Sequence, residues 1–263
     1  MIDLHSHILS GIDDGSGSVE MSIAMARMAV ADGIEVMACT PHIVPGVYPN
    51  EPADIRVRVN ELQALLIEQQ IPLELVVGAD VHISPDLLQR MQGEAPPVLN
   101  GSRYFLFEPP HHVLPPRLLD FCASLIAAGF TPILTHPERL TWVKGHFGVI
   151  RALAARGVLM QLTAGSLTGN FGRSAQRLSD QILDEGLCDV IASDAHNLTS
   201  RPPVLSLARS TVSQRFGDAE AEKMFVSRPR AILRSEDVER SLAVPGAVRH
   251  TPLRRLMKMM ARA

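Results

Sequence analysis

The chain has 263 residues, of which 46% are hydrophobic, so it can bury a sizeable core as one α/β barrel or as two small domains. Its formal net charge of -3 argues against a general nucleic-acid-binding protein. No segment approaches the roughly 18 consecutive apolar residues needed to span a membrane, and Asp3, His5 and His7 interrupt any apolar core of a signal peptide, so we expect a cytoplasmic protein.

Short apolar runs that predict strands alternate with longer stretches that predict helices. The first predicted strand begins at Ile2, and the others span 34–40, 73–77, 104–107, 131–135, 158–162 and 189–193. The predicted helices span 18–32, 53–70, 115–128, 147–155, 174–185, 203–216 and 218–226. Such alternation implies parallel strands joined by crossover helices. Seven units are visible, one fewer than in the eight-stranded barrel, and an open doubly wound sheet is the alternative fold.

Potential metal ligands follow almost every predicted strand. They are His5 and His7 at the first strand, Asp14 seven residues later, and then His42, Asp80, Glu108, His136, Asp194 and His196. Only the run at 158–162 ends without an obvious ligand. Active sites of parallel barrels lie at the carboxyl ends of the strands, so these groups should converge there, whereas an open sheet would spread them along a line.

Nine nitrogen and oxygen ligands are too many for one ion, because zinc prefers four ligands and manganese or iron takes up to six. The sequence therefore predicts two or three divalent ions and does not choose among Mn, Fe and Zn. Clustered ions make hydroxide available near neutral pH. Arg139 and Arg201 follow two of the ligands, and a guanidinium group is well shaped to bind phosphate. A metal-dependent amidohydrolase is possible from the ligands alone but does not explain the two arginines.

The opening segment MIDLHSHILSGIDDGS and the later segments TPH, THPER and SDAHN resemble the polymerase and histidinol phosphatase (PHP) superfamily. More narrowly, they are similar to bacterial metal-dependent tyrosine-protein phosphatases of capsule and exopolysaccharide synthesis. The resemblance covers about residues 1–235. It implies a distorted seven-stranded barrel with up to three metal ions, phosphotyrosine hydrolysis by a metal-bridging hydroxide, and a polysaccharide-assembly tyrosine kinase as partner.

The resemblance also implies a distribution of ligands. One ion takes His5, His7 and Asp194, a second takes Glu108 and His136, a third takes Asp14, His42 and His196, and position 80 bridges the first two. The family usually has glutamate at position 80, so Asp80 is one methylene short and puts full occupancy of the second site in doubt. Arg139, Arg201 and Asp194 are the residues expected to act in catalysis.

Two other functions stay open at this point. One is a phosphatase for small phosphomonoesters of the histidinol-phosphate type, and the other is a catalytically weak regulator that binds the kinase or phosphotyrosine. A cysteine-dependent phosphatase is excluded, because the residues six positions after the three cysteines are Pro45, Ala128 and Asp194 and none is arginine.

Four other side chains lie near the predicted active face. His82, His111 and His112 could touch substrate or protonate the leaving oxygen, although we prefer a structural role for each. Trp142 could line the mouth of the site or simply pack in the core.

The last part of the chain differs from the rest. We assign residues 1–240 to the catalytic barrel and 241–263 to a basic tail or helix. From residue 249 onwards the tail has no acidic side chain, and Leu253, Leu256, Met257 and Met260 would share one helix face. Such a helix could pack on the barrel or make peripheral contact with an anionic membrane.

Overall fold

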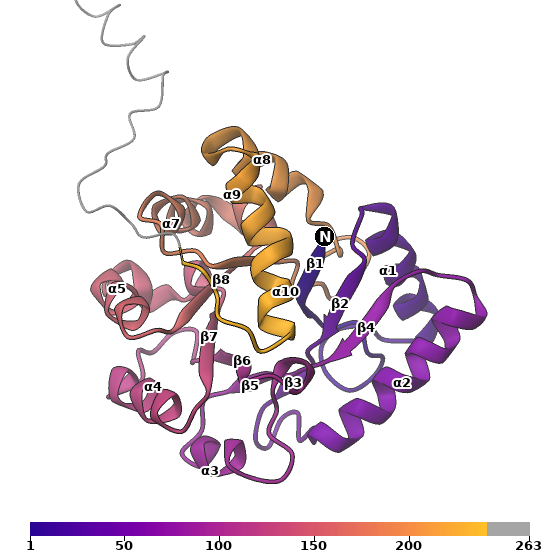
Figure 1. Ribbon diagram of the computed structural model, residues 1–263, viewed down its shortest axis with the longest axis horizontal. Coiled ribbons are helices and arrows are strands. Elements are labelled where there is room, and N and C mark those ends of the chain that lie inside the picture. The colour runs from indigo at the N-terminus through magenta and orange to yellow at the C-terminus, as the bar shows by residue number, and fades with distance from the viewer. Residues whose placement is uncertain (241–263) are drawn as a thin grey trace, which may run out of the picture.

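The computed structural model describes residues 1–240, so the predicted tail at 241–263 lies outside the described residues. Strands alternate with helices along this part of the chain (Figure 1). The strands are β1 (Ile2–Ser6), β2 (Val36–Cys39), β3 (His42–Ile43), β4 (Glu74–Val77), β5 (Asp80–His82), β6 (Tyr104–Glu108), β7 (Thr131–Thr135), β8 (Leu159–Thr163) and β9 (Val190–Ala192). The helices are α1 (Val19–Ala31), α2 (Pro52–Glu68), α3 (Leu87–Met91), α4 (Leu118–Ala127), α5 (Phe147–Ala155), α6 (Ala164–Leu167), α7 (Gly172–Asp184), α8 (Ser206–Phe216), α9 (Asp218–Glu222) and α10 (Arg228–Leu233).

The strands form two parallel sheets, in the orders β1-β2-β4 and β3-β5-β6-β7-β8-β9. The predicted α/β fold with parallel strands is therefore confirmed. β1 is an edge strand of the first sheet and β9 an edge strand of the second. Between them, Asp194 N donates to His5 O at 2.9 Å and His7 N donates to Ala195 O at 2.8 Å, which places the end of β9 beside the end of β1. The sheets are nevertheless separate, so a closed ring of seven strands stays a prediction.

Two short strands, β3 and β5, were not predicted: they follow the predicted strands at 34–40 and 73–77, so seven apolar runs give nine strands in the described residues. Pro41 lies between β2 and β3 and has no N–H to donate. Gly78 lies between β4 and β5, where a Cβ atom would come within 2.7 Å of Leu99 and 2.9 Å of Thr40. Both breaks lie one or two residues before a predicted metal ligand, so they re-aim the chain just before the site.

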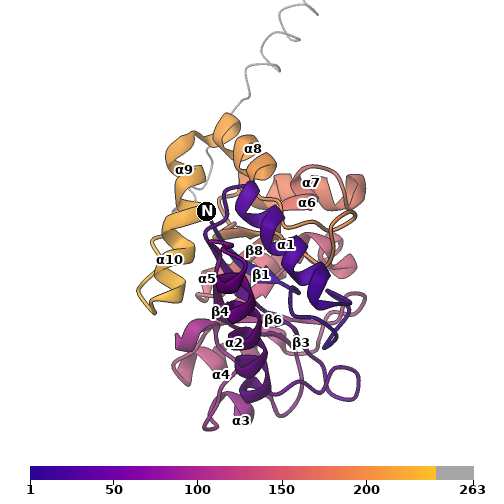
Figure 2. The same ribbon diagram turned by 90° about the vertical axis from the view of Figure 1, so that its right-hand side faces the viewer.

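The helices lie around the outside of the strands, and α10 lies across one end of them (Figures 1 and 2). Helix α1 begins as predicted, because the Ser18 side chain accepts a hydrogen bond from Met21 N. Helix α4 starts at Leu118 and not at 115, because Arg117 has a left-handed backbone with φ of 56°. The predicted helix at 218–226 is wrong in its extent: α9 ends at Glu222 and a π-helical turn leads into α10, which the sequence did not predict.

Two apolar clusters hold the strands in place. The larger packs the helices against the outer side of the strands. The smaller draws residues from seven strands and is covered by Ile232 and Leu233 of α10; its strand members are Ile2, Leu4, Ala38, Val76, Tyr104, Leu106, Ile133, Leu159 and Val190. Each large aliphatic side chain buried in this way contributes roughly 1.5–3 kcal/mol, so the strand ends have a rigid support. No helix within residues 1–240 is long and apolar enough to cross a membrane.

Candidate metal centre

The predicted ligands come together at the carboxyl ends of the strands. In the described chain, eight of the nine belong to groups whose ligand atoms lie within 4.8 Å of one another. The groups are the Asp14 group (His7, Asp14, His42 and His196), the Asp80 group (His5, His7 and Asp80), the His136 group (Glu108, His111 and His136), and a linking group (His42, Asp80 and Glu108). Because the groups share members, they form one continuous centre.

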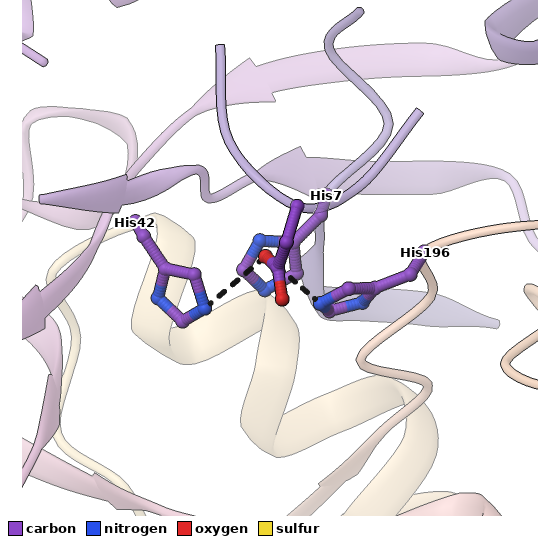
Figure 3. A group of neighbouring side chains, drawn as sticks. His7, His42 and His196 are labelled. Carbon is purple, nitrogen blue, oxygen red and sulfur yellow. Dashed lines mark ion pairs between the residues drawn. The ribbon is translucent and has the colours of Figure 1, made fainter. Parts of the chain in front are cut away.

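The Asp14 group places three imidazoles around one carboxylate. Asp14 Oδ1 lies 3.5 Å from His42 Nε2 and 3.4 Å from His196 Nε2, and Figure 3 draws these two ion pairs as dashed lines. The ring of His7 lies 4.0 Å from the ring of His196 and 4.5 Å from that of His42, measured between centroids. The structure therefore brings together the three residues of the implied third ion and adds His7 to them.

Asp194 is the predicted ligand that belongs to none of these groups. Its Oδ1 lies 3.3 Å from both His5 Nε2 and His7 Nε2. Its Oδ2 accepts hydrogen bonds from Arg139 Nη1 and Arg201 Nη2. Asp194 thus joins the imidazoles of the centre to the two predicted phosphate-binding arginines.

The guanidinium groups of Arg139 and Arg201 lie on the same aromatic ring. The Cζ atoms are 4.4 Å and 5.9 Å from the centroid of Phe171, within the range of cation–π attraction. Gly165 allows this arrangement, because a Cβ atom there would lie 3.0 Å from the Phe171 ring. No motif in the sequence indicates a role for Phe171, which lies in the loop just before α7.

The backbone is strained at two of the ligands. His136 has φ of 35° and Asp194 has φ of 53°, in the left-handed region that residues other than glycine rarely adopt. Each follows the end of a strand, and the left-handed turn redirects its side chain. Strain of this kind costs of order 1–3 kcal/mol per residue and is found mostly where function requires it.

Two buried hydrogen bonds fix the orientation of His5 and His7. His5 Nδ1 lies 2.7 Å from Gln161 Oε1, whose amide nitrogen donates to Leu162 O, so the His5 Nδ1 carries the proton. His7 Nδ1 lies 2.7 Å from Asp13 Oδ2. Both imidazoles therefore present Nε2 to the centre, and these two atoms are 3.1 Å apart. Two converging lone pairs repel each other unless a proton or a cation lies between them, so the residues fit a metal ion.

The burial of unpaired polar atoms also fits metal binding. Both carboxylate oxygens of Asp80 are buried without a hydrogen-bond partner in the described chain, as are His42 Nδ1 and His196 Nε2. Burial and the charge of Glu108 hold the pKa of Asp80 well above its usual range. An uncompensated buried carboxylate is costly, and a divalent cation would supply the missing partner.

The imidazoles respond in two ways to this environment. Burial lowers the pKa of His5 to about 3 and that of His42 to about 4, so both are neutral near pH 7 and offer a lone pair. Burial also disfavours the charged form of His7, but hydrogen bonds with Asp13 and Asp194 raise its pKa to about 10. A cation bound at His7 Nε2 would replace this proton as the positive charge between the carboxylates.

Asp13 and Gln161 contact two of the candidate ligands, and neither contact was predicted from the sequence. Gln161 lies in β8, the one strand whose run ends without a predicted ligand, and it orients His5 without being a ligand itself. Asp13 is the neighbour of the predicted ligand Asp14. Gly15 lets the loop close over His7, since a Cβ atom there would lie 2.2 Å from His7 O. The doubled aspartate was the one signal that could have suggested a second role.

Replacing Gln161 by leucine is expected to weaken metal binding about 10- to 100-fold, the usual cost of removing a partner that orients a ligand. Leucine has a similar size but leaves the Nδ1 proton of buried His5 without an acceptor. Isothermal titration of the metal-free protein with Mn²⁺ or Zn²⁺ measures this. Gln161→Glu, which keeps an acceptor, should bind more tightly than Gln161→Leu, and equal affinity of the two variants would contradict the prediction.

The remaining side chains near the centre have simpler roles. Trp142 is buried and its Nε1 donates to Pro110 O at 3.1 Å, so it packs in the core. His82 Nδ1 lies 4.0 Å from Glu108 Oε2, and His112 Nδ1 lies 3.3 Å from Thr141 Oγ1. Cys39, Cys122 and Cys188 are free and buried, as expected of reduced thiols.

Comparison with known proteins gives a consistent result. The family model described as capsular polysaccharide synthesis, CpsB/CapC, matches residues 1–234. The tyrosine-protein phosphatase YwqE of Bacillus subtilis is 34% identical, over 93% of this chain and 96% of its own length. The tyrosine-protein phosphatase CpsB of Streptococcus pneumoniae is 29% identical, over 89% of this chain and 98% of its own length.

Solved structures agree with this comparison. A crystal structure from a study of YwqE and CpsB, described there as unique metal-dependent tyrosine phosphatases, superposes with a TM-score of 0.88 at 34% identity, covering 92% of this chain and 97% of that one. A histidinol phosphate phosphatase of Lactococcus lactis has a TM-score of 0.53 at 13% identity, covering 86% of this chain and 96% of that one. The second likeness shows a shared fold alone.

Proposed function

Because this chain belongs to the CpsB/CapC family of capsular polysaccharide synthesis, we propose that it is a metal-dependent phosphatase that hydrolyses phosphotyrosine in proteins. The relatives YwqE and CpsB are named tyrosine-protein phosphatases, and the site of this chain has the groups that such a reaction needs. The observation that carries the proposal is the meeting of Arg139 and Arg201 at Asp194, on the edge of the cluster of imidazoles and carboxylates.

The arginines are placed to bind the phosphoryl group. Their side chains are 15% and 21% exposed, whereas Asp194 between them is buried, so the guanidinium groups face both the centre and the solvent. Asp194 accepts a hydrogen bond from each guanidinium group, and Phe171 stacks against both of them. A phosphate group bound here would accept charge-assisted hydrogen bonds from both guanidinium groups, with its ester oxygen pointing outwards.

The histidines and carboxylates of the centre are proposed to hold two or three divalent ions, of Mn, Fe or Zn. The Asp14 group, the Asp80 group and the His136 group are the candidate sites, and Asp80 is proposed to connect the last two through the linking group. Bound ions would acidify a water molecule for attack and neutralise phosphate charge. The residues of this chain contribute by fixing Nε2 of His5 and His7 towards the centre and by excluding water from the buried side.

Residues 1–240 are proposed to form the catalytic unit. Its seven strand runs would close as a distorted barrel through the contacts between His5, His7 and the residues after β9. The kinase of a polysaccharide-assembly system is the proposed source of the phosphotyrosine substrate, in line with the family description. A cytoplasmic location would match such a substrate.

One assay separates this function from the hydrolysis of small phosphomonoesters. Metal-free protein is supplied in turn with Mn²⁺, Fe²⁺ and Zn²⁺ and given a phosphotyrosine peptide or histidinol phosphate at equal concentration. We expect a larger kcat/KM for the peptide with at least one of the metals. A preference for histidinol phosphate would replace the proposed substrate, and no hydrolysis of either would leave a binding protein as the function.

Blocking the cysteines is expected to leave phosphatase activity within about twofold of the untreated protein, because buried thiols with high pKa values are poor nucleophiles. Burial raises the pKa of Cys122 to about 12 and holds the pKa values of Cys39 and Cys188 above their usual range. The measurement is the rate after iodoacetamide treatment, with alkylation followed by mass spectrometry. Activity that falls in proportion to alkylation would point to a thiol mechanism.

A further inference from the structure

The His136 group has a member that the predicted ligand set lacks. His136 and Glu108 were the expected ligands of one ion, with residue 80 as their bridging partner. In the structure Asp80 lies with His5 and His7 and with His42 and Glu108, but it shares no group with His136 among the described residues. The third ligand atom beside His136 and Glu108 comes from His111.

The three side chains of this group converge on a small volume. His111 Nε2 lies 2.8 Å from Glu108 Oε1, and His136 Nε2 lies 3.3 Å from the same oxygen. The rings of His111 and His136 are 5.3 Å apart between centroids. The three residues thus offer ligand atoms that all lie within 4.8 Å of one another, close enough to bind a single cation.

The loop that carries His111 is held firmly. Its backbone carbonyl accepts hydrogen bonds from Thr141 N at 2.9 Å and from Thr141 Oγ1 at 3.1 Å. Its neighbour Pro110 accepts one from the buried Trp142 indole, and Pro109 and Pro110 restrict the backbone further. His111 is therefore positioned before any ion binds, and its side chain is only 34% exposed.

His111 and His112 are neighbours with different surroundings. The imidazole of His112 is exposed and contacts Thr141 Oγ1, away from Glu108. His112 therefore offers a matched control, because it has the same side chain on the same loop but belongs to none of the metal-ligand groups in residues 1–240.

We propose that His111 is a protein ligand of the cation held by Glu108 and His136, and that it occupies the place that the short side chain of Asp80 leaves unfilled. Two histidines and one carboxylate form a three-ligand set that leaves a coordination position open, as in catalytic zinc sites. The inference rests on the proposed function only in requiring that the centre binds divalent metal. It assigns His111 a role that does not depend on the identity of the substrate.

The experiment compares the metal binding of four proteins: wild type, His111→Ala, His111→Gln and His112→Ala. Glutamine can still donate a hydrogen bond to Glu108, but its neutral amide is a poor ligand for zinc or manganese. Metal-free samples are titrated with Zn²⁺ or Mn²⁺ by calorimetry, and bound metal is counted by elemental analysis after dialysis at limiting metal. Circular dichroism checks that each variant is folded.

We expect both His111 variants to bind one ion at least about 100-fold more weakly than wild type, on the scale of losing a direct ligand and not only its support. His112→Ala should bind as wild type does. Wild-type affinity in His111→Gln, with or without a loss in His111→Ala, would overturn the proposal, because a hydrogen bond to Glu108 would then be the whole role of His111.

The relation to Asp80 is tested by adding Asp80→Glu to His111→Ala. The additional methylene gives the carboxylate at position 80 a longer reach, so the double variant should regain about tenfold or more of the lost affinity. No gain in affinity would overturn the claim that His111 fills the place left by Asp80. A wild-type protein that shows the His111-dependent ion but hydrolyses no phosphotyrosine peptide would contradict the proposed function and leave this inference standing.

Discussion

Replacing Arg139 or Arg201 by alanine is expected to lower kcat/KM for a phosphotyrosine peptide by about 100-fold or more. Each guanidinium group would make charge-assisted hydrogen bonds to the phosphoryl oxygens, and the loss of such contacts costs roughly 2–4 kcal/mol, with 1.4 kcal/mol for each factor of ten. The metal content should stay unchanged, because a guanidinium group has no lone pair to offer to a metal ion. The measurements are steady-state kinetics and elemental analysis of the same preparations.

Two further variants make this result specific. Arg139→Lys keeps the charge but loses the planar fork, so its rate should fall between those of wild type and Arg139→Ala. Arg151 is a matched control: it pairs with Glu185 and stacks on Phe147 at 4.9 Å, as Arg139 does with Asp194 and Phe171, but it lies on α5 with 56% of its side chain exposed. Arg151→Ala should retain wild-type kinetics. Equal rates for Arg139→Ala and Arg151→Ala would place Arg139 outside the site.

The candidate site was predictable because its chemistry follows the ends of the strands. Glu108 and His136 each stand directly after an apolar run and His42 stands two residues after one, and parallel strands bring such residues to the same edge. The predicted fold and the predicted ligands therefore support each other. The pair of arginines could be added because each follows a ligand closely in sequence.

The residues that orient the ligands could not be predicted in the same way. Gln161 contacts His5 across 156 positions of sequence, and β8 and β1, which carry them, are not paired with each other in either sheet. The role of Phe171 depends likewise on the meeting of two arginines from different loops. A glutamine inside an apolar strand and a phenylalanine before a helix have no distinctive spacing, so only the packed structure reveals their contacts.

Three elements of the fold, β3, β5 and α10, were likewise not predictable from the sequence. Pro41 and Gly78 look like the ends of strands in the sequence, whereas after each of them the chain forms a further short strand, β3 or β5, in the other sheet. Helix α10 was missed because Arg228-Pro229-Arg230 interrupts any apolar periodicity. Its two apolar residues, Ile232 and Leu233, complete the central cluster, and that contact is visible only once the strands surround it.

The shared ligand His7 gives the second large effect. His7 belongs to both the Asp14 group and the Asp80 group, so its loss should weaken two sites at once, whereas the loss of Asp14 should weaken one. We expect wild-type protein purified without chelator to carry at least two ions per chain. His7→Ala should then lose more metal than Asp14→Asn. Its activity should fall by about 1,000-fold or more, because without metal the reaction would lack both the activated water and the neutralisation of phosphate charge.

The thermal stability of His7→Ala tests the same prediction without measuring activity. A metal ion whose free concentration is 100 times its dissociation constant stabilises the folded protein by about 2.7 kcal/mol. Chelation of the metal should therefore lower the Tm of wild type. Without metal, His7 is protonated near pH 7, since its pKa is raised to about 10, and it forms a charged pair with Asp13 and Asp194. His7→Ala removes that pair as well, so its Tm should be lower than that of chelated wild type and should respond less to added metal. A Tm that rises with metal as much in His7→Ala as in wild type, together with fewer than one ion per wild-type chain, would show that the cluster is not the metal centre of the enzyme.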